Sequence, residues 1–136
     1  MSVIITDSGF GPDTWADSYT PLATANSQST AVDLASSDDP SDLADLLRSL
    51  TMIRVDFPGF ADGRGFTIAR QLRLLGYQGR LRARGHVISD QYAMARRAGF
   101  DEIEISDDLA ARQPESDWLF RANWQDHDYQ SRLRAI

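Results

Sequence analysis

Three short stretches of this chain alternate charged and apolar residues, and this alternation restricts the fold more than any other feature of the sequence. Residues 52–57 (MIRVDF), 79–84 (GRLRAR) and 102–105 (EIEI) each show the period of two that is typical of a β-strand. Strands covered by helices on both faces read as continuous apolar runs instead. The three strands are therefore predicted to form a sheet with one apolar and one charged face.

Helical patterns separate these strands. Residues 65–75 carry one apolar helical stripe and are followed by Gly76, and Ser89 is expected to cap a second helix that ends before Gly99. Strands that alternate with helices of about ten residues indicate βαβ units and a mainly parallel sheet. Right-handed crossovers between neighbouring strands place the helices mostly on one face. We predict an α/β fold that is either barrel-like or an open two-layer sheet, whose charged face then meets solvent or a partner subunit.

The length of the chain suits one domain better than two. Residues 1–30 are rich in Gly, Pro, Ser, Thr and Asp without periodicity, so we expect an irregular N-terminal segment in which Trp15 and Tyr19 act as anchors. The single α/β domain is assigned to residues 31–136. Within this domain, Ser41 is predicted to cap an early helix that carries a stripe of leucines.

The composition excludes several kinds of chemistry. The chain has no cysteine, which rules out disulfides, thiol catalysis and cysteine-ligated metal centres. His86 and His127 are far apart and no ligand spacing accompanies them, so no metal site is predicted. All 14 basic residues are arginine, which leaves no lysine for a Schiff base or a P-loop. With no dinucleotide fingerprint either, we predict no cofactor.

Charge is distributed very unevenly along the chain. The net charge is −7 over residues 1–50, +6 over residues 51–100 and −5 over residues 101–136. A basic middle between acidic flanks indicates internal charge pairing, an anion site, or both, whereas the flanks would repel a nucleic acid. No apolar run approaches the roughly 20 residues needed to cross a bilayer, and no basic leader precedes the first apolar residues. We therefore expect a cytoplasmic protein with no nucleic-acid or membrane partner.

Ligand sites in parallel α/β sheets lie at the carboxyl ends of the strands, in the loops that lead to helices. Two such loops, PGFADGRG and RARGHVISDQ, follow the strands at 52–57 and 79–84. If these strands are neighbours, side chains from both loops converge on one site. No catalytic residue is assigned, and the candidate ligand-binding residues are Asp62, Gly63, Arg64, Gly65, Arg82, His86, Asp90 and Gln91.

Each candidate has a functional and a structural interpretation. The glycines around Arg64 either bring backbone N–H groups to an anion that Arg64 clamps, or serve a tight turn in which Asp62 accepts backbone hydrogen bonds. Arg82 needs a partner, because a buried unpaired charge is very costly. That partner is either an internal acid, such as Glu102, or an anionic ligand. His86 is either a general base or simply exposed.

The stretches FPGFADGRGFTIARQLR and GYQGRLRARGHVISDQYAMARRAGFDEIEI resemble the small bacterial proteins grouped as domain of unknown function 934. The resemblance covers roughly residues 30–105 and depends on the Asp-Gly-Arg-Gly run and on the later Leu-Arg-Ala…Gly…Asp-Gln pattern. His86 departs from it, because relatives have an acid after that glycine. Such proteins are commonly encoded beside sulfite or nitrite reductase genes and labelled oxidoreductases. The resemblance thus implies a role in assimilatory sulfate and sulfite reduction.

Three functions follow from these observations. The first is an accessory protein of sulfite reduction that binds a sulfite reductase or a small oxyanion through the Asp-Gly-Arg-Gly loop. With no cysteine, dinucleotide fingerprint or evident redox ligand, this protein would have no redox chemistry of its own. The second is an enzyme acting on an anionic or phosphorylated small molecule at the strand ends. The third is an interaction module that forms a homodimer through its charged sheet face.

Overall fold

Seven strands form one sheet in the computed structural model, which describes residues 2–127. Their spatial order runs from the second strand at one edge to the third at the other, 2-1-7-6-5-4-3. The third to seventh strands are parallel neighbours, whereas the first pairs antiparallel with the second and the seventh. The strands are β1 (Ser2–Thr6), β2 (Gly9–Gly11), β3 (Thr20–Pro21), β4 (Ala31–Leu34), β5 (Met52–Phe57), β6 (Arg80–Gly85) and β7 (Glu102–Ser106).

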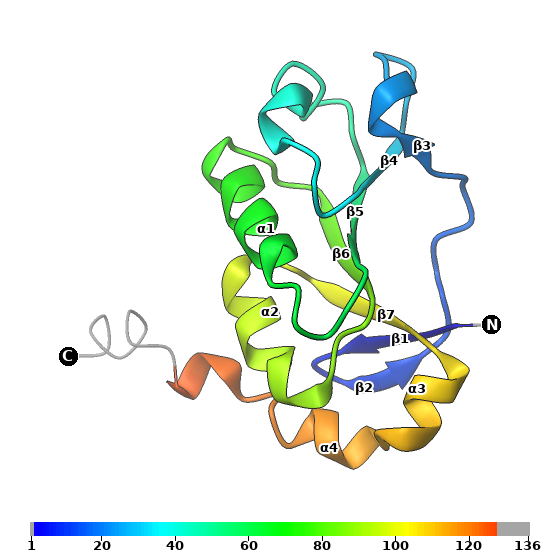
Figure 1. The fold of residues 1–136 in the computed structure, drawn as a ribbon, viewed down its shortest axis with the longest axis vertical. Helices are drawn as coiled ribbons and strands as arrows, with labels where there is room; N and C mark the ends of the chain where they lie inside the picture. Colours follow the sequence, from blue (N-terminus) through cyan, green and yellow to red (C-terminus); the bar gives the residue numbers. More distant parts are fainter. Residues whose placement is uncertain (1, 128–136) are drawn as a thin grey trace.

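Helices cover one face of this sheet. In Figure 1, α1 (Arg64–Leu74) and α2 (Tyr92–Ala98) lie together on one side of the strands, and α3 (Asp107–Arg112) and α4 (Glu115–Leu119) follow β7 at the lower end. The edge strands β2 and β3 do not pair with each other, so the sheet is open rather than a barrel. The predicted α/β fold is confirmed. The described 3₁₀-helices are η1 (Leu22–Thr24), η2 (Pro40–Leu43), η3 (Ser89–Gln91) and η4 (Trp124–His127).

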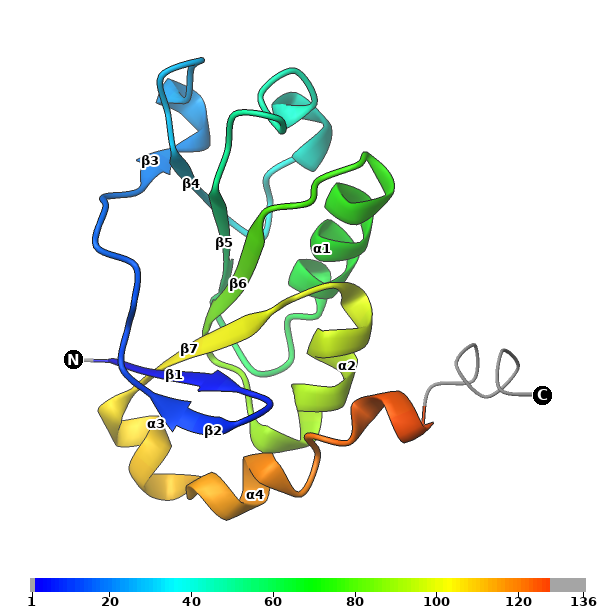
Figure 2. The ribbon, with the colours of Figure 1, turned by 180° about the vertical axis from the view of Figure 1, so that it is seen from behind.

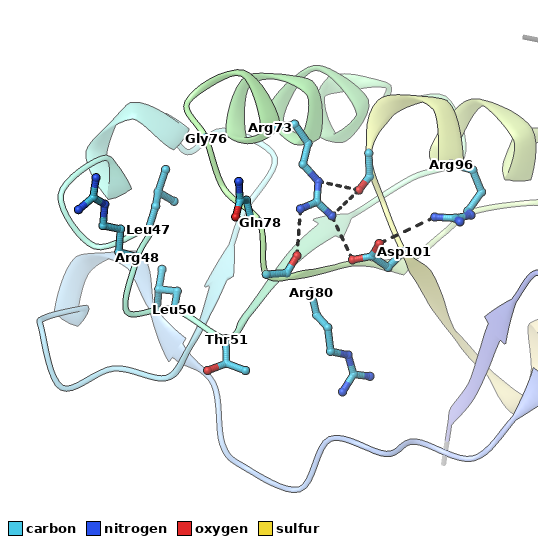
Figure 3. A pocket seen from close by; sticks show the side chains of 12 residues that line it. Leu47, Arg48, Leu50, Thr51, Arg73, Gly76, Gln78, Arg80, Arg96 and Asp101 are labelled. Atoms are coloured by element: carbon cyan, nitrogen blue, oxygen red, sulfur yellow. Dashed lines mark hydrogen bonds and ion pairs between the residues drawn. The ribbon is translucent and has the colours of Figure 1, made fainter. Parts of the chain in front are cut away.

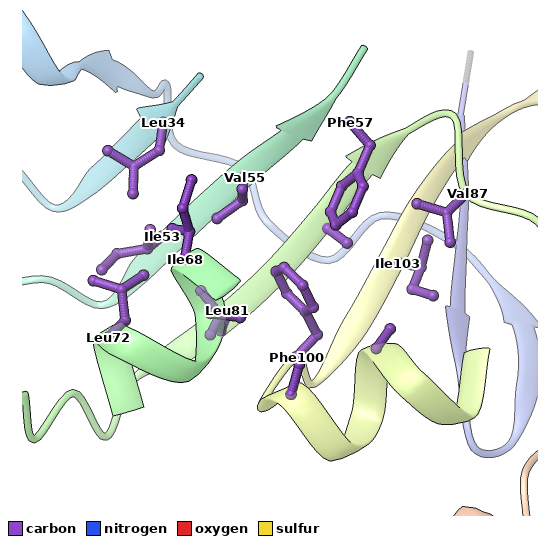
Figure 4. Packing of buried hydrophobic residues seen from close by; sticks show 14 of the residues in the cluster. Leu34, Ile53, Val55, Phe57, Ile68, Leu72, Leu81, Val87, Phe100 and Ile103 are labelled. Atoms are coloured by element: carbon purple, nitrogen blue, oxygen red, sulfur yellow. The ribbon is translucent and has the colours of Figure 1, made fainter. Parts of the chain in front are cut away.

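The apolar residues of the alternating strands face α1 and α2. Val55 on β5 and Leu81 on β6 are completely buried, and Leu72 of α1 packs into the same core (Figure 4). The ring of Phe57, at the end of β5, lies 5.8 Å from that of Phe100, which follows α2. Each such side chain contributes about 1.5–3 kcal/mol when it is fully buried. The period-two pattern thus does place the core between the sheet and one helical layer.

Residues 12–19 cross the opposite face of the sheet, and we call this segment the strap. It runs from β2 at one edge to β3 at the other and lies on the side away from α1 and α2 (Figures 1 and 2). An extended chain joining Gly11 to Thr20 reaches about 30 Å at most. The strand spacings between them, each about 4.8 Å, add up to about 29 Å. A segment of this length is therefore sufficient to cross the sheet.

Arg82 lies between the sheet and the strap, and its side chain is 0% exposed. It donates to two acids of β7, Glu102 (Nε to Oε2, 2.7 Å) and Glu104 (Nη1 to Oε1, 2.9 Å). From the other side it donates to Asp13 of the strap (Nη2 to Oδ1, 3.0 Å). The partners of Arg82 are thus internal acids. The charged face, which we expected to meet solvent or a partner subunit, is covered at its centre by the strap.

Aromatic side chains of the strap also contact the charged face. The ring of Tyr19 lies 3.7 Å from the guanidinium carbon of Arg54, and that of Trp15 lies 5.8 Å from the guanidinium carbon of Arg80. Such contacts are worth about 0.5–2 kcal/mol each, depending on how far they are desolvated. Trp15 and Tyr19 therefore do anchor this segment, and the two arginines supply the surface on which they lie.

Two local expectations differ from the structure. The segment expected to be irregular, residues 1–30, contributes β1, β2 and β3 to the same sheet as the rest of the chain. The early helix is only η2, and its cap is Asp39, whose carboxylate accepts from the backbone N–H of Ser41 (3.0 Å). After η2 the chain continues in turns that still bury Leu47 and Leu50. Burial of leucines is thus achieved here without a regular helix.

The predicted cap of the second helix is also different. That helix begins as η3 and continues as α2, and Ser89 makes no capping hydrogen bond with its side chain. The side chain of Gln91 takes this role, because its Oε1 accepts from the backbone N–H of Ile88 (3.1 Å). Gly99 ends α2 with a φ of 121°, as expected of a left-handed stop.

Replacing Arg82 with methionine should lower the free energy of unfolding by about 3 kcal/mol or more, because Glu102 and Glu104 would lose a buried counter-charge. Urea denaturation measures this loss. The control is Arg70→Met. Arg70 is an exposed residue of α1 whose side chain makes no hydrogen bond or ion pair with any described residue. This variant should stay within about 0.5 kcal/mol of the wild type. A loss below about 1 kcal/mol for Arg82→Met would contradict the conclusion that the ion pairs of Arg82 with Glu102 and Glu104 stabilise the fold.

The strap should loosen in acid. Burial opposes ionisation of Asp13, but hydrogen bonds from Arg82 and the backbone of Trp15 outweigh it and hold its pKa below the ordinary value of 3.8. A lowered folded-state pKa stabilises the protein above pH 3.8, and this contribution disappears as the pH falls further. Asp13→Asn should therefore melt about 2–4 °C below the wild type at pH 7, with a smaller gap at pH 3. Asp17→Asn, an exposed change in the same strap, should melt at the temperature of the wild type. Calorimetry measures these melting temperatures.

Candidate functional site

The loops after β4, β5 and β6 lie side by side at the carboxyl edge of the sheet, because these three strands are parallel neighbours. Two hydrogen bonds join the β5 and β6 loops. The backbone N–H of His86 donates to the carbonyl of Phe57 (2.9 Å), and Nε2 of Gln91 donates to the carbonyl of Phe60 (3.1 Å). The two loops named from the sequence are therefore in contact. We call residues 58–65 and 86–91 together the carboxyl edge.

Asp62 and Arg64 form a closed pair at the start of α1. The carboxylate of Asp62 accepts from the backbone N–H of Arg64 (3.1 Å) and from its guanidinium (Nη2 to Oδ2, 2.7 Å). These hydrogen bonds hold the pKa of Asp62 well below its usual range. Arg64 also donates to the hydroxyl of Ser36 after β4 (2.8 Å), yet its side chain remains 60% exposed. Arg64 is thus fixed in position while it still faces solvent.

The two glycines beside Arg64 have different requirements. A Cβ at Gly65 would lie 2.4 Å from Cζ of the buried Phe57 ring, so only glycine lets the first turn of α1 pack this closely. Gly63 has a φ of −90°, which any residue adopts, and a Cβ there would meet only Cδ2 of Phe66 at 3.8 Å. Packing therefore explains Gly65 but gives no reason for Gly63.

An aromatic pair lies beside this ion pair on the carboxyl edge. The rings of Phe60 and His86 meet edge to face with their centres 5.1 Å apart, and Phe60 is 42% exposed. Nδ1 of His86 lies 3.2 Å from the carbonyl oxygen of Phe57, which orients the imidazole. The edge thus displays an arginine, a phenylalanine and a histidine whose positions are all set by local contacts.

The side chains of two candidates from the sequence are engaged with residues outside the carboxyl edge. Arg82 lies within β6 on the opposite face of the sheet from α1 and is enclosed by its internal acids. Asp90 forms an ion pair with Arg121, which follows α4 (2.5 Å). The other six candidates are gathered at the carboxyl edge: Asp62, Gly63, Arg64, Gly65, His86 and Gln91.

Sequence reasoning missed a hollow of about 620 Å³ on the strap side of the carboxyl ends of β4, β5 and β6. Arg54 and Arg84 line it, and Arg84 lies 3.9 Å from Asp56 and 3.5 Å from Glu104. The available signal was the period-two pattern, since Asp56 and Arg84 are register partners on the charged face. Within residues 2–127, no three histidine or acidic side chains are grouped so that they could hold a metal ion.

The protein is of the α/β class, with an open, mostly parallel sheet that has helices on one face and a strap across the other. Its Asp-Gly-Arg-Gly run leads into the first turn of α1. Within that class, the chain belongs to the bacterial protein family of unknown function DUF934, whose model matches residues 31–135. The strap lies outside the matched region. No curated protein and no solved structure matches the chain. Among residues 2–127, no helix is both long and apolar enough to cross a membrane.

A pair of glycine substitutions tests the packing account of the loop. Gly65→Ala should lower the free energy of unfolding by about 1–3 kcal/mol, because the buried Phe57 ring must move to admit the methyl group. Gly59→Ala in the same loop should stay within about 0.5 kcal/mol, since a Cβ there meets nothing within 4 Å. Urea denaturation measures the free energy of unfolding of both variants. Equal losses would mean that Gly65 is not a packing requirement.

Proposed function

We propose that this protein is a cytoplasmic accessory protein of assimilatory sulfite reduction that binds its reductase through the carboxyl edge and performs no redox chemistry itself. The pathway comes from the resemblance, whose members are encoded beside sulfite or nitrite reductase genes. The observation that carries the binding role is Arg64, which is 60% exposed although Asp62 and Ser36 hold it in place. A small oxyanion is the other ligand that this arginine suits.

The composition and rigidity of the carboxyl edge favour binding of a protein. Arginine and aromatic residues are the types that most often dominate interface energies. Arg64 and Phe60 are held by contacts within the free protein, so little side-chain entropy is lost when a partner covers them. Through Ser36 the edge also contacts the loop after β4, so three neighbouring loops give a partner a surface rather than a single point.

The same geometry argues against Asp62 as a catalytic base. Its carboxylate already accepts hydrogen bonds from Arg64, and its lowered pKa makes it a weak proton acceptor. General-base catalysis at neutral pH uses groups whose pKa lies near 7. Asp62 therefore fits the role of a positioning residue for Arg64.

The hollow near Arg54 and Arg84 supports a second candidate, an enzyme for an anionic or phosphorylated small molecule. It lies where parallel sheets bind ligands, and its volume of about 620 Å³ is suitable. It ranks second because its lining carries more aspartates than arginines, which repels an anion. A homodimer through the charged face ranks third, because the strap already covers the centre of that face. The four lining aspartates are Asp33, Asp38, Asp42 and Asp56.

Binding to the purified sulfite reductase of the same bacterium tests the proposal. Arg64→Glu should weaken the affinity at least tenfold in biolayer interferometry, since it removes the exposed guanidinium and reverses its charge. Arg70→Glu makes the same charge change on the outer side of α1 and should keep the affinity within about threefold. Equal effects of both variants would assign the loss to overall charge. No binding by the wild type, together with unchanged sulfite-dependent growth after deletion of the gene, would overturn the proposal.

A further inference from the structure

The helical layer carries a charge contrary to that of the whole chain. The net charge of the chain is −6, yet α1 (Arg64–Leu74) and α2 (Tyr92–Ala98) contain five arginines and no acidic residue. The outer side of this layer is therefore a basic surface on an acidic protein. Its arginines are Arg64, Arg70, Arg73, Arg96 and Arg97.

Three of these arginines have an acidic partner within the protein. Arg64 has its partner at the carboxyl edge. Arg73 donates to Asp101 (3.0 Å), and Figure 3 shows its other contacts, with backbone carbonyls beside the hollow at the amino ends of the strands. Arg96 pairs with Asp7 (3.1 Å). Each of these three charges thus has an internal counter-charge.

Arg70 and Arg97 are the two helical arginines without an acidic partner among the described residues. Arg70 is exposed, and its side chain makes no hydrogen bond or ion pair with any of them. Arg97 is also exposed, and its Nη2 donates to the backbone carbonyl of Trp124 (3.0 Å). A carbonyl orients a guanidinium without cancelling its charge, and the other N–H groups of Arg97 stay free. Both arginines therefore offer charge and hydrogen-bond donors to a ligand.

These two arginines line one groove between the helices. The groove measures about 380 Å³, and none of the described residues that line it is acidic. Its floor is apolar and fixed, because the ring centre of Phe66 lies 5.0 Å from that of the buried Phe57, and Ala98 is 8% exposed. Met94, which is 54% exposed, adds an apolar wall that can adapt its shape. We call it the interhelical groove, and its lining residues are Phe66, Thr67, Arg70, Met94, Arg97 and Ala98.

The interhelical groove has an apolar end and a basic end. Both helices run from the carboxyl end of one parallel strand to the amino end of the next, so they point in the same direction. In each helix the arginine follows the apolar side chain by about one turn, about 5 Å. Arg70 follows Phe66 in this way, and Arg97 follows Met94. The apolar side chains therefore lie toward the carboxyl edge, and the guanidinium groups lie toward the amino ends of the strands.

The shape of the groove suits a helix. Small-molecule sites bury most of the ligand surface, whereas four of the six residues that line this groove are exposed. A third helix packs well in the channel between two neighbouring helices. Side chains one turn apart on such a helix are about 5–6 Å apart, which matches the separation of the two ends of the groove. One helix can thus place apolar and acidic side chains at both ends at once.

Charge distinguishes between the occupants of such a groove. A second copy docked through the same face would bring two basic layers together. Residues 128–136, DYQSRLRAI, carry two arginines and one aspartate, which is the wrong sign of charge for this groove. An anionic membrane would repel the rest of the chain, whose net charge is negative. An acidic helix of another protein matches both the charge and the apolar floor.

We propose that the interhelical groove binds an acidic amphipathic helix of a partner protein. Apolar side chains of this helix lie against Phe66 and Met94, and its carboxylates pair with Arg70 and Arg97 through charge-assisted hydrogen bonds. The lining of the groove shares no residue with the carboxyl edge. The proposal therefore does not depend on the function proposed for Arg64.

The test uses a fluorescein-labelled, alanine-based helical peptide with a stripe of three leucines flanked by four glutamates. It is titrated with the full-length protein in low salt and followed by anisotropy. Arg70→Glu and Arg97→Glu should each weaken binding at least fivefold, whereas Arg48→Glu should weaken it less than twofold. Arg48 is exposed and makes no hydrogen bond or ion pair with a described residue, but it lies outside the groove. Peptides with glutamine for glutamate, or with serine for leucine, should bind at least tenfold more weakly.

Other outcomes overturn the proposal. Equal weakening by all three arginine variants would reduce the effect to overall charge, and full affinity of the serine peptide would mean that the apolar floor is not used. An oligomer that Arg70→Glu dissociates in light scattering would make a second copy the occupant. A synthetic peptide of residues 128–136 that displaces the probe below the probe's own dissociation constant would make the chain's own end the occupant. Tighter binding to phosphatidylglycerol vesicles than to the probe would make the groove part of a membrane surface.

Discussion

The rest of the structure depends on the buried guanidinium of Arg82. It joins the central strand β6 to two glutamates of β7 and to Asp13 of the strap, so one side chain holds three segments that are distant in sequence. Removing one partner of a buried ion pair usually costs several kcal/mol, because the remaining charge stays desolvated. Arg82 therefore holds the strap on the sheet, and the centre of the charged face is an interior surface although its residues are those of an exposed one.

This interior pairing explains why only some arginines of the basic middle of the chain, residues 51–100, remain accessible to solvent. Arg54 and Arg82 are neutralised within the sheet by Asp33, Glu102 and Glu104, which all belong to other strands, β4 and β7. Other arginines stay accessible, among them Arg64 at the carboxyl edge and Arg70 on the outer side of α1. Internal pairing and exposed cationic surfaces thus exist together, at separate places.

The core of the fold could be predicted from the sequence because its signals are local. The alternation in residues 52–57, 79–84 and 102–105 gave the strands, the apolar face and the placement of the helices. The strap could not be predicted, because its main contact joins residues that are 69 positions apart. The strands at its two ends, β2 and β3, are also very short. Likewise, the sequence placed Arg82 with Arg64, but side chains within a strand alternate between faces, and Arg82 lies on the face away from α1.

Hydrogen–deuterium exchange of the protein, alone and bound to its sulfite reductase, tests the central claim most directly. The claim is that the carboxyl edge is the binding surface while the strap keeps the charged face closed. We predict slower exchange at residues 58–65 and 86–91 in the complex, with unchanged exchange at residues 12–19. Faster exchange in the strap, with no change in the two loops, would contradict it and would make the charged sheet face the binding surface.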